Sequence, residues 1–112
     1  MNSEERGKEL EAELERILGI LKNRIHPEKV ILFGSLASGR LRPESDIDLL
    51  IVQDSKDPIF ERTKKIETVL DRRYAADLIV LTPAELQSLL DSDNRYLKNI
   101  FCDGKVLYER PA

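Results

Sequence analysis

The chain has 112 residues, enough for one hydrophobic core, so we expect a single domain over residues 1–112 rather than a catalytic domain with a separate acceptor-binding domain. Its formal net charge of -3 at pH 7 provides no overall basic field, which argues against a protein that binds long nucleic acids. The single cysteine excludes an internal disulfide bond, and the polar N-terminal segment and the lack of a long apolar run predict a cytoplasmic protein with no signal peptide and no membrane span.

The first predicted element is a helix from about Ser3 to Asn23. Apolar residues recur there at helical spacing, with charged residues between them, so we expect the apolar stripe to pack on a sheet and the polar face to be solvated. His26 and Pro27 end this helix. Although His26 is the only histidine, it lies in a connecting loop with no group nearby to activate it, so we assign it no catalytic role.

Two apolar strands, Val30–Phe33 and Leu49–Val52, are joined through a Gly-Ser turn and a polar loop. Gly34 lets the backbone approach a ligand closely, and a short helical turn is predicted to begin in the segment Leu36-Ala37-Ser38 that follows Ser35. Free N–H groups at a helix start, together with the serine hydroxyl, suit phosphate oxygens. The loop Gly39–Ser45 allows the two strands to run antiparallel side by side, which brings this turn to the start of the second strand.

Asp46 and Asp48 open the second strand. Side chains two residues apart in a strand share a face, so both carboxylates point the same way and repel each other. A hard divalent cation removes that repulsion, and Mg²⁺ binds through one or two carboxylates together with substrate phosphates. Taken alone, a Gly-Ser pair is usually an ordinary turn and an Asp-x-Asp a solvated edge or a turn cap. Their combination between two apolar strands favours a metal and triphosphate site.

A second helix is predicted from Asp57 at its N-cap, with Pro58 at the first helical position, to about Arg73. Its expected buried stripe is formed by Ile59, Phe60, Thr63, Ile66, Val69 and Leu70. The strand Ala76–Leu81 follows, so strand, helix and strand are predicted to form a right-handed crossover with parallel pairing.

Asp77 is the one charged residue of that third strand. A carboxylate inside so apolar a run needs a partner or a metal ion, because burying a lone charge is costly. The alternative is a solvated aspartate on an edge strand. Asp71, at the end of the preceding helix, is a weaker candidate for the same metal-binding role.

The last segments complete the predicted core. Thr82 and Glu85 form a capping box around Pro83, which predicts a short helix to about Leu90. A further helix over residues 94–102 and an edge strand over residues 105–108 follow.

Three residues of the helix at 94–102 could carry chemistry. Tyr96 and Phe101 could stack a base, but aromatic residues at helical spacing among leucine and isoleucine favour positions in the core. Cys102 is likewise expected to be buried and inert.

The pair Gly34-Ser35, followed after ten residues by Asp46-Ile47-Asp48, resembles the signature of the nucleotidyltransferase superfamily that includes DNA polymerase beta. In its small size the chain is similar to the minimal nucleotidyltransferases (MNT), a prokaryotic branch often encoded beside a HEPN-domain protein and acting as its antitoxin. The resemblance covers about residues 29–109 and implies an α+β fold, a small mixed sheet flanked by helices. One departure is Ser38, where many relatives carry an arginine of the phosphate clamp.

The resemblance implies a role for each motif residue. The expected catalytic and metal-binding residues are Asp46, Asp48 and Asp77. The first two would hold the Mg²⁺ ion that carries ATP, and the third would complete the site of a second Mg²⁺ ion. The expected nucleotide-binding residues are Gly34, Ser35, Arg40 and Arg42, with the arginines adding positive charge against the phosphates.

The sequence shows no obvious acceptor-binding module, so we expect a partner to supply the acceptor. Resemblance to the MNT family implies that AMP from ATP is transferred to a hydroxyl, expected to be a tyrosine, on a HEPN toxin with which the chain forms a complex. Two alternatives stay open: a non-catalytic antitoxin that only binds its partner, and an antibiotic-type nucleotidyltransferase acting on a small molecule. The three aspartates favour an enzyme over the binder, and the lack of a helical C-terminal domain disfavours the antibiotic type.

Overall fold

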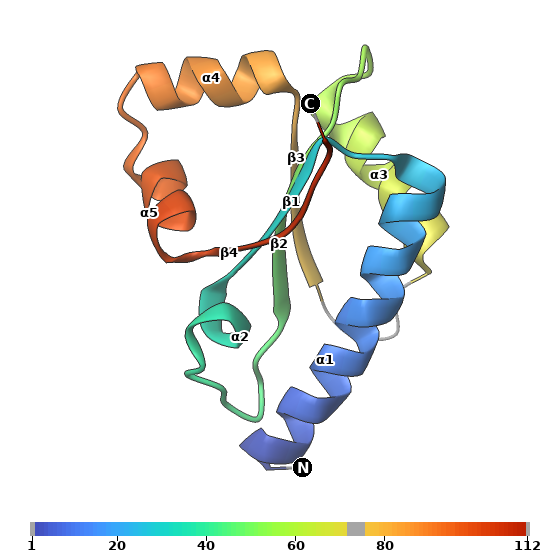
Figure 1. Cartoon of the computed structure of the whole chain (residues 1–112), viewed down its shortest axis with the longest axis vertical. Coiled ribbons are helices and arrows are strands. Elements are labelled where there is room, and N and C mark those ends of the chain that lie inside the picture. The colour runs from blue at the N-terminus through green and yellow to red at the C-terminus, as the bar shows by residue number, and fades with distance from the viewer. Residues whose placement is uncertain (1, 72–75, 112) are drawn as a thin grey trace.

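The computed structural model describes residues 2–71 and 76–111. The elements are α1 (Ser3–Ile20), the π-helical turn η1 (Leu21–Ile25), β1 (Lys29–Phe33), α2 (Gly34–Ser38), β2 (Ile47–Val52), α3 (Ile59–Leu70), β3 (Ala76–Leu81), α4 (Pro83–Asp91), α5 (Arg95–Asp103) and β4 (Lys105–Glu109). The sheet lies at the centre, with α1 and α3 on one side and α4 and α5 on the other (Figure 1). The α+β fold with a mixed sheet that the sequence predicted is confirmed.

The strands follow the order β3-β2-β1-β4 in one sheet. β1 pairs antiparallel with β2 and β4, whereas β2 and β3, which α3 connects, pair in parallel as expected. The register places Asp48 of β2 opposite Phe33, the last residue of β1, and beside Asp77 of β3. The parts of the strands that carry the motif residues therefore meet at one end of the sheet.

The two faces of the sheet are buried under different helices. On β2, Ile47, Leu49 and Ile51 belong to the apolar cluster that includes α1 and α3, whereas Leu50 belongs to the cluster that includes α5. Every residue of β2 is buried except Asp48, which is half-buried. Because side chains alternate along a strand, Asp48 lies on the α5 face of the sheet.

α3 differs from its prediction at both ends. It begins at Ile59, with Pro58 at the N-cap position and no capping side chain, instead of having the proline inside its first turn. It ends at Leu70, because Asp71 adopts the left-handed conformation with φ of 44°. The predicted end at Arg73 lies outside the described residues.

The buried face of α3 also differs from the predicted stripe. Ile59 and Phe60 are 51% and 72% exposed, whereas Arg62 is buried. The Arg62 guanidinium forms a bidentate ion pair with Glu85 of α4 and donates a hydrogen bond to the Val80 carbonyl at 3.3 Å. The buried face of α3 therefore runs through Arg62, Ile66 and Leu70.

The burial of two residues on α5 also differs from the prediction. Tyr96 is 59% exposed and Cys102 is exposed, so the expected core positions of both residues are wrong. Phe101 is half-buried against the apolar cluster on this face. Leu97 and Ile100 fill the buried stripe of α5, and the two exposed residues lie outside it.

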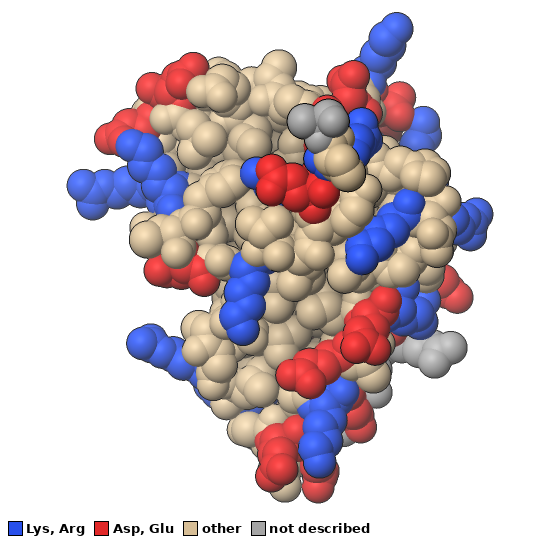
Figure 2. All heavy atoms as spheres, in the orientation of Figure 1, with Lys and Arg blue, Asp and Glu red and all other residues tan. Residues whose placement is uncertain are grey.

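Figure 2 shows Lys and Arg side chains interspersed with Asp and Glu over this face of the molecule, without an extended area of one sign. This mixed surface fits the small net charge of -3. Among the described helices, none has the combined length and apolarity needed to cross a bilayer.

We expect Glu85→Gln to lower the free energy of unfolding by about 1–3 kcal/mol at pH 7, because it leaves the buried Arg62 charge without its partner. This is less than for a fully buried pair, since the Glu85 side chain is 41% exposed. The Arg62 hydrogen bonds, followed by that from the Thr82 backbone, lower the pKa of Glu85 from 4.5 to about 2. A lowered pKa stabilises the fold above about pH 4.5, and this contribution is lost as the pH falls toward 2.

Urea unfolding of the two proteins between pH 7 and pH 3 measures this difference. The matched control is Glu61→Gln, which removes an exposed carboxylate from α3 and should change stability little. An equal loss in both variants, or a difference that does not shrink as the pH falls, would contradict the assignment.

Candidate active site

The candidate site is centred on the turn between β1 and α2. Gly34 has a φ of 78°, a left-handed conformation that favours glycine. A Cβ atom at this position would lie 2.1 Å from Oδ2 of Asp48, so no other residue fits without displacing that carboxylate. The Gly-Ser turn and the Asp-x-Asp segment, predicted to meet from the sequence, are therefore in direct contact.

The loop between α2 and β2 is held by a buried serine that the sequence did not single out. Ser45 is 3% exposed, and its Oγ accepts hydrogen bonds from Ser35 Oγ at 3.0 Å and from the Arg42 backbone N–H at 2.8 Å. The Ser35 hydroxyl, expected to contact phosphate, thus also braces this loop. No local sequence signal marks Ser45, because a serine in a polar loop is usually solvated.

Positive charge lies beside the same turn. A depression of about 570 Å³ is lined by Ser35, Ser38, Arg40, Leu41 and Arg42. The structure therefore groups Ser35 with the two arginines that were predicted to bind phosphates. Arg42 Nε lies 3.5 Å from Glu44, and both side chains are largely exposed. Ser38 donates a hydrogen bond to the Ser35 carbonyl at 3.3 Å and brings no charge of its own.

The three candidate carboxylates lie on two neighbouring strands. Asp46 precedes β2, Asp48 is within it, and Asp77 is its partner on β3. Asp77 is exposed on an edge strand, which is the position that the alternative of a solvated aspartate supposed. Its carboxylate still interacts directly with that of Asp48. Asp71 does not join this group, and its carbonyl accepts a hydrogen bond from Arg16 at 3.2 Å.

Electrostatic repulsion is concentrated on Asp48. Burial is the largest cause that raises the pKa of Asp48 from 3.8 to about 6, followed by the charge and hydrogen bond of Asp77 and by the charge of Asp46. Two carboxylates can share a hydrogen bond only when one of them holds a proton. A divalent cation would supply the same compensation of charge through oxygen ligands, which Mg²⁺ prefers.

The fit of a metal ion can be judged from these oxygens. The described part of the chain holds no ready-made cluster of three or more metal-binding side chains. Asp48 and Asp77 lie together, whereas an oxygen of Asp46 is 3.8 Å from the Arg6 guanidinium. The donor chemistry and the excess of negative charge fit Mg²⁺, with two carboxylates already side by side and a third next to them. The assignment of these ligands stays a prediction.

Arg6 of α1 is a second residue that sequence reasoning missed. Its Nε donates a hydrogen bond to the Ser45 carbonyl at 3.0 Å, and its side chain is 15% exposed. One residue on, Gly7 packs so closely that a Cβ atom would lie 2.7 Å from Leu41 Cδ1. A glycine within a charged helical segment was the available signal that the helix approaches another part of the chain there.

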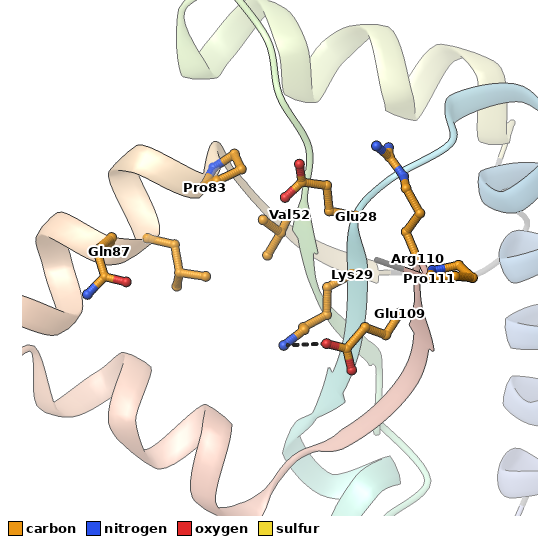
Figure 3. Close-up of a pocket in the computed structure, with 9 residues that line it drawn as sticks. Glu28, Lys29, Val52, Pro83, Gln87, Glu109, Arg110 and Pro111 are labelled. Atoms are coloured by element: carbon orange, nitrogen blue, oxygen red, sulfur yellow. Dashed lines mark ion pairs between the residues drawn. The ribbon is translucent and has the colours of Figure 1, made fainter.

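Another cavity, of about 420 Å³, lies away from this site (Figure 3). Its lining includes an ion pair of 3.4 Å between Lys29 and Glu109, together with Val52 and Pro83. Lys29 is the first residue of β1, whereas the carboxylates lie near the last, Phe33. This cavity is therefore at the opposite end of the strands from the candidate site.

This chain is similar to known proteins both in sequence and in fold. Residues 15–112 match the family described as polymerase beta, nucleotidyltransferase. Over 81 residues the chain is 33% identical to the putative protein adenylyltransferase MJ0604 of Methanocaldococcus jannaschii, which covers 72% of this chain and 78% of that protein. The fold is similar to that of a putative nucleotidyltransferase from Sulfolobus solfataricus, with a TM-score of 0.68, 22% identity and coverage of 98% and 89% of the two chains.

Two toxin–antitoxin structures are also similar. A toxin–antitoxin complex with AMP-PNP matches with a TM-score of 0.53 and 25% identity, over 86% of this chain and 73% of that chain. The complex of a tri-AMPylated HEPN toxin from Shewanella oneidensis with its MNT antitoxin matches with a TM-score of 0.52 and 20% identity, over 90% and 73% of the two chains. At about a fifth identity, the Sulfolobus and Shewanella likenesses show a shared fold only.

We expect Asp48→Asn to raise the free energy of unfolding at pH 7 when no metal ion is present. The folded-state pKa of about 6 lies above the ordinary value of 3.8, so the carboxyl favours the fold at low pH, and this contribution is lost as the pH rises through 6. An asparagine amide donates to Asp77 at every pH. Urea unfolding in a chelator at pH 3 and pH 7 should show the gain at pH 7 alone, with the exposed Asp54→Asn unchanged at both.

We expect Arg6→Ala to destabilise the fold by about 1–2 kcal/mol, because it removes a charge-assisted hydrogen bond that holds the backbone next to Asp46. The matched control is Lys8→Ala, which removes an exposed cation from the same helix. Urea unfolding at pH 7 compares them. Equal stability of the two variants would show that α1 does not hold this loop.

Proposed function

This chain belongs to the polymerase beta nucleotidyltransferase family, and on that premise we propose that it transfers AMP from Mg²⁺-bound ATP to a hydroxyl group of a partner protein. The observation that carries the proposal is the contact between the Gly34 turn and the Asp48 carboxylate, which is in register with Asp77. Groups that suit phosphate and groups that suit a cation are thus adjacent. Because the reaction consumes ATP, the proposal assigns the protein to the cytoplasm.

The triphosphate is assigned to the turn and loop at the end of β1. Backbone N–H groups at the start of α2 and the Ser35 hydroxyl would bind the phosphate oxygens. Arg40 and Arg42, which line the adjoining depression with Ser35, would oppose the charge that develops on the leaving pyrophosphate. Because Ser38 carries no charge, Arg40 and Arg42 would supply the positive charge here.

The carboxylates are assigned to the cation and the acceptor. Asp46 and Asp48 would hold the Mg²⁺ ion of the nucleotide, and Asp77 would complete a second cation site with them. When bound, Mg²⁺ neutralises phosphate charge and favours ionisation of the acceptor hydroxyl. The acceptor hydroxyl gives up its proton to solvent as its oxygen bonds to the α-phosphorus, the bond from that phosphorus to the bridging oxygen breaks, and pyrophosphate leaves. Asp77 is exposed on the edge strand, where an incoming acceptor can reach it.

A partner protein is proposed as the acceptor for two reasons. The relative MJ0604 bears the name of a protein adenylyltransferase, and its identity of 33% extends over most of both chains. A toxin–antitoxin complex of similar fold holds AMP-PNP, and another contains an AMPylated HEPN toxin. We therefore infer that the acceptor is a hydroxyl, with tyrosine the first candidate, on a HEPN toxin that this chain binds and inactivates.

A non-catalytic antitoxin is the second candidate. It is favoured by the contact of Asp46 with Arg6 and by the lack of a ready-made three-ligand metal cluster in the described part of the chain. Under this alternative the chain would inactivate its partner by binding alone.

We expect labelled ATP, Mg²⁺ and a HEPN toxin that this chain binds to yield a covalent AMP on that toxin. The Asp46→Ala/Asp48→Ala double variant should give none, whereas Asp77→Asn should reduce transfer roughly 100-fold while retaining most of the Mg²⁺-ATP binding. Mass spectrometry detects the product and calorimetry measures the binding. Asp54→Asn is the matched control, because this exposed aspartate lies outside the site.

The same variants separate the two candidates. The double variant should still co-purify with the partner, since interface energy comes mainly from buried apolar anchors. If it protects cells from the toxin as well as the parent does, and no AMP is found on the toxin, the binding-only function holds. Unchanged transfer by Asp77→Asn would instead move the role of third carboxylate to another residue, Asp71 first.

A further inference from the structure

A small pocket borders the Gly34 turn on the face of the sheet that α5 covers. It encloses about 210 Å³ and is lined by Phe33, Gly34, Tyr96, Asn99, Ile100 and Asp103. We call it the α5 pocket. Since Gly34 also contacts Asp48, this pocket and the carboxylate site share one wall. Sites for whole drug-sized ligands measure about 300–1,000 Å³, so the α5 pocket suits one ring system rather than an entire nucleotide.

One face of α5 forms a wall of the pocket, and α5 packs against β1. Asn99, Ile100 and Asp103 follow Tyr96 by three, four and seven positions, which places all four lining residues of α5 on the same side of the helix. Gly104 fixes the distance to the sheet, because a Cβ atom there would lie 2.8 Å from Ile31 Cγ2 and 2.9 Å from the Leu32 carbonyl. The pocket therefore has a preformed shape.

Tyr96 offers an aromatic surface to a ligand. Its ring packs edge-to-face on Phe33, with centroids 6.2 Å apart and planes at 85°. The residue is nevertheless 59% exposed, although a tyrosine at helical spacing was expected in the core. An aromatic ring that stays accessible beside a preformed hollow provides a stacking surface for a flat heterocycle.

The polar groups of the α5 pocket favour a base over a phosphate. Within residues 2–71 and 76–111, the side chains of Asn99 and Asp103 are both exposed and form no hydrogen bond or ion pair with other described residues. An asparagine amide can bind N6 and N7 of adenine together, and a carboxylate accepts from an exocyclic amine. The negative charge of Asp103 would repel a phosphate group.

We propose that the α5 pocket binds the adenine base of the nucleotide, with Tyr96 stacking on the ring and Asn99 reading its N6 and N7 edge. The inference rests on the proposed function, which assigns the triphosphate to the Gly34 turn. It adds a determinant of base specificity, carried by a helix that follows the catalytic strands in the chain. The pocket lies next to the turn, so one nucleotide can occupy both.

Calorimetric titrations with Mg²⁺-ATP and with Mg²⁺ and inorganic triphosphate test the assignment. Tyr96→Ala should bind ATP roughly tenfold more weakly, the loss typical of removing a stacking aromatic, and should bind triphosphate as the parent does. Asn99→Ala should reduce the preference for ATP over UTP. The matched control is Phe60→Ala, which removes a ring that is 72% exposed on α3 and should change neither affinity.

The outcomes separate this inference from the proposed function. If the parent binds both probes and Tyr96→Ala binds ATP equally well, the base assignment is wrong and the nucleotidyltransferase proposal stands. If Tyr96→Ala binds ATP normally but no longer modifies the partner, the pocket holds the acceptor and the base assignment is also wrong. If the parent binds neither probe, both proposals fail. Thermal unfolding of Tyr96→Phe, which keeps the ring, and of Tyr96→Ala checks that a lost affinity is not a lost fold.

Discussion

The contact between Gly34 and the Asp48 carboxylate is the constraint on which the rest of the candidate site depends. It follows from the backbone register, because Asp48 lies opposite Phe33, the residue immediately before the turn. A slip of one residue between β1 and β2 would move the carboxylate to the face covered by α1. The groups suited to phosphate and to a cation are therefore positioned by strand pairing rather than by flexible side chains, and only a glycine leaves room for both.

A second layer of contacts fixes the loop that leads into β2. Ser45 binds Ser35 and the Arg42 backbone through its hydroxyl, and its carbonyl accepts from Arg6. The N-terminal turn of α1 thus reaches the segment that carries Asp46. This contribution lies outside residues 15–112, the part of the chain that matches the family. The residues that match the family therefore do not include Arg6, which helps to hold the loop before β2 in place.

The sequence predicted those features that are local or have a regular period. The strands, the spacing from the Gly-Ser turn to the paired aspartates and the capping box at Thr82 all belong to this class, and the structure confirms them. The misses depend on contacts between distant segments. Arg6 lies 39 positions from Ser45, and the Arg62 pair with Glu85 spans 23 positions and overrides the apolar stripe predicted for α3. Periodicity measures how apolar a face is, and it does not reveal a buried ion pair.

The edge position of Asp77 affects both the pairing of the sheet with other chains and the access of other molecules to the carboxylate. β3 is an edge strand, and an exposed edge invites pairing with another chain. A charged side chain on that edge opposes such pairing, and the same exposure leaves the carboxylate open to a second molecule. By contrast, Asp48 lies on the interior strand β2, where it is half-buried and burial raises its pKa. Under the proposed function, this edge position would let an acceptor hydroxyl on another protein approach Asp77 directly.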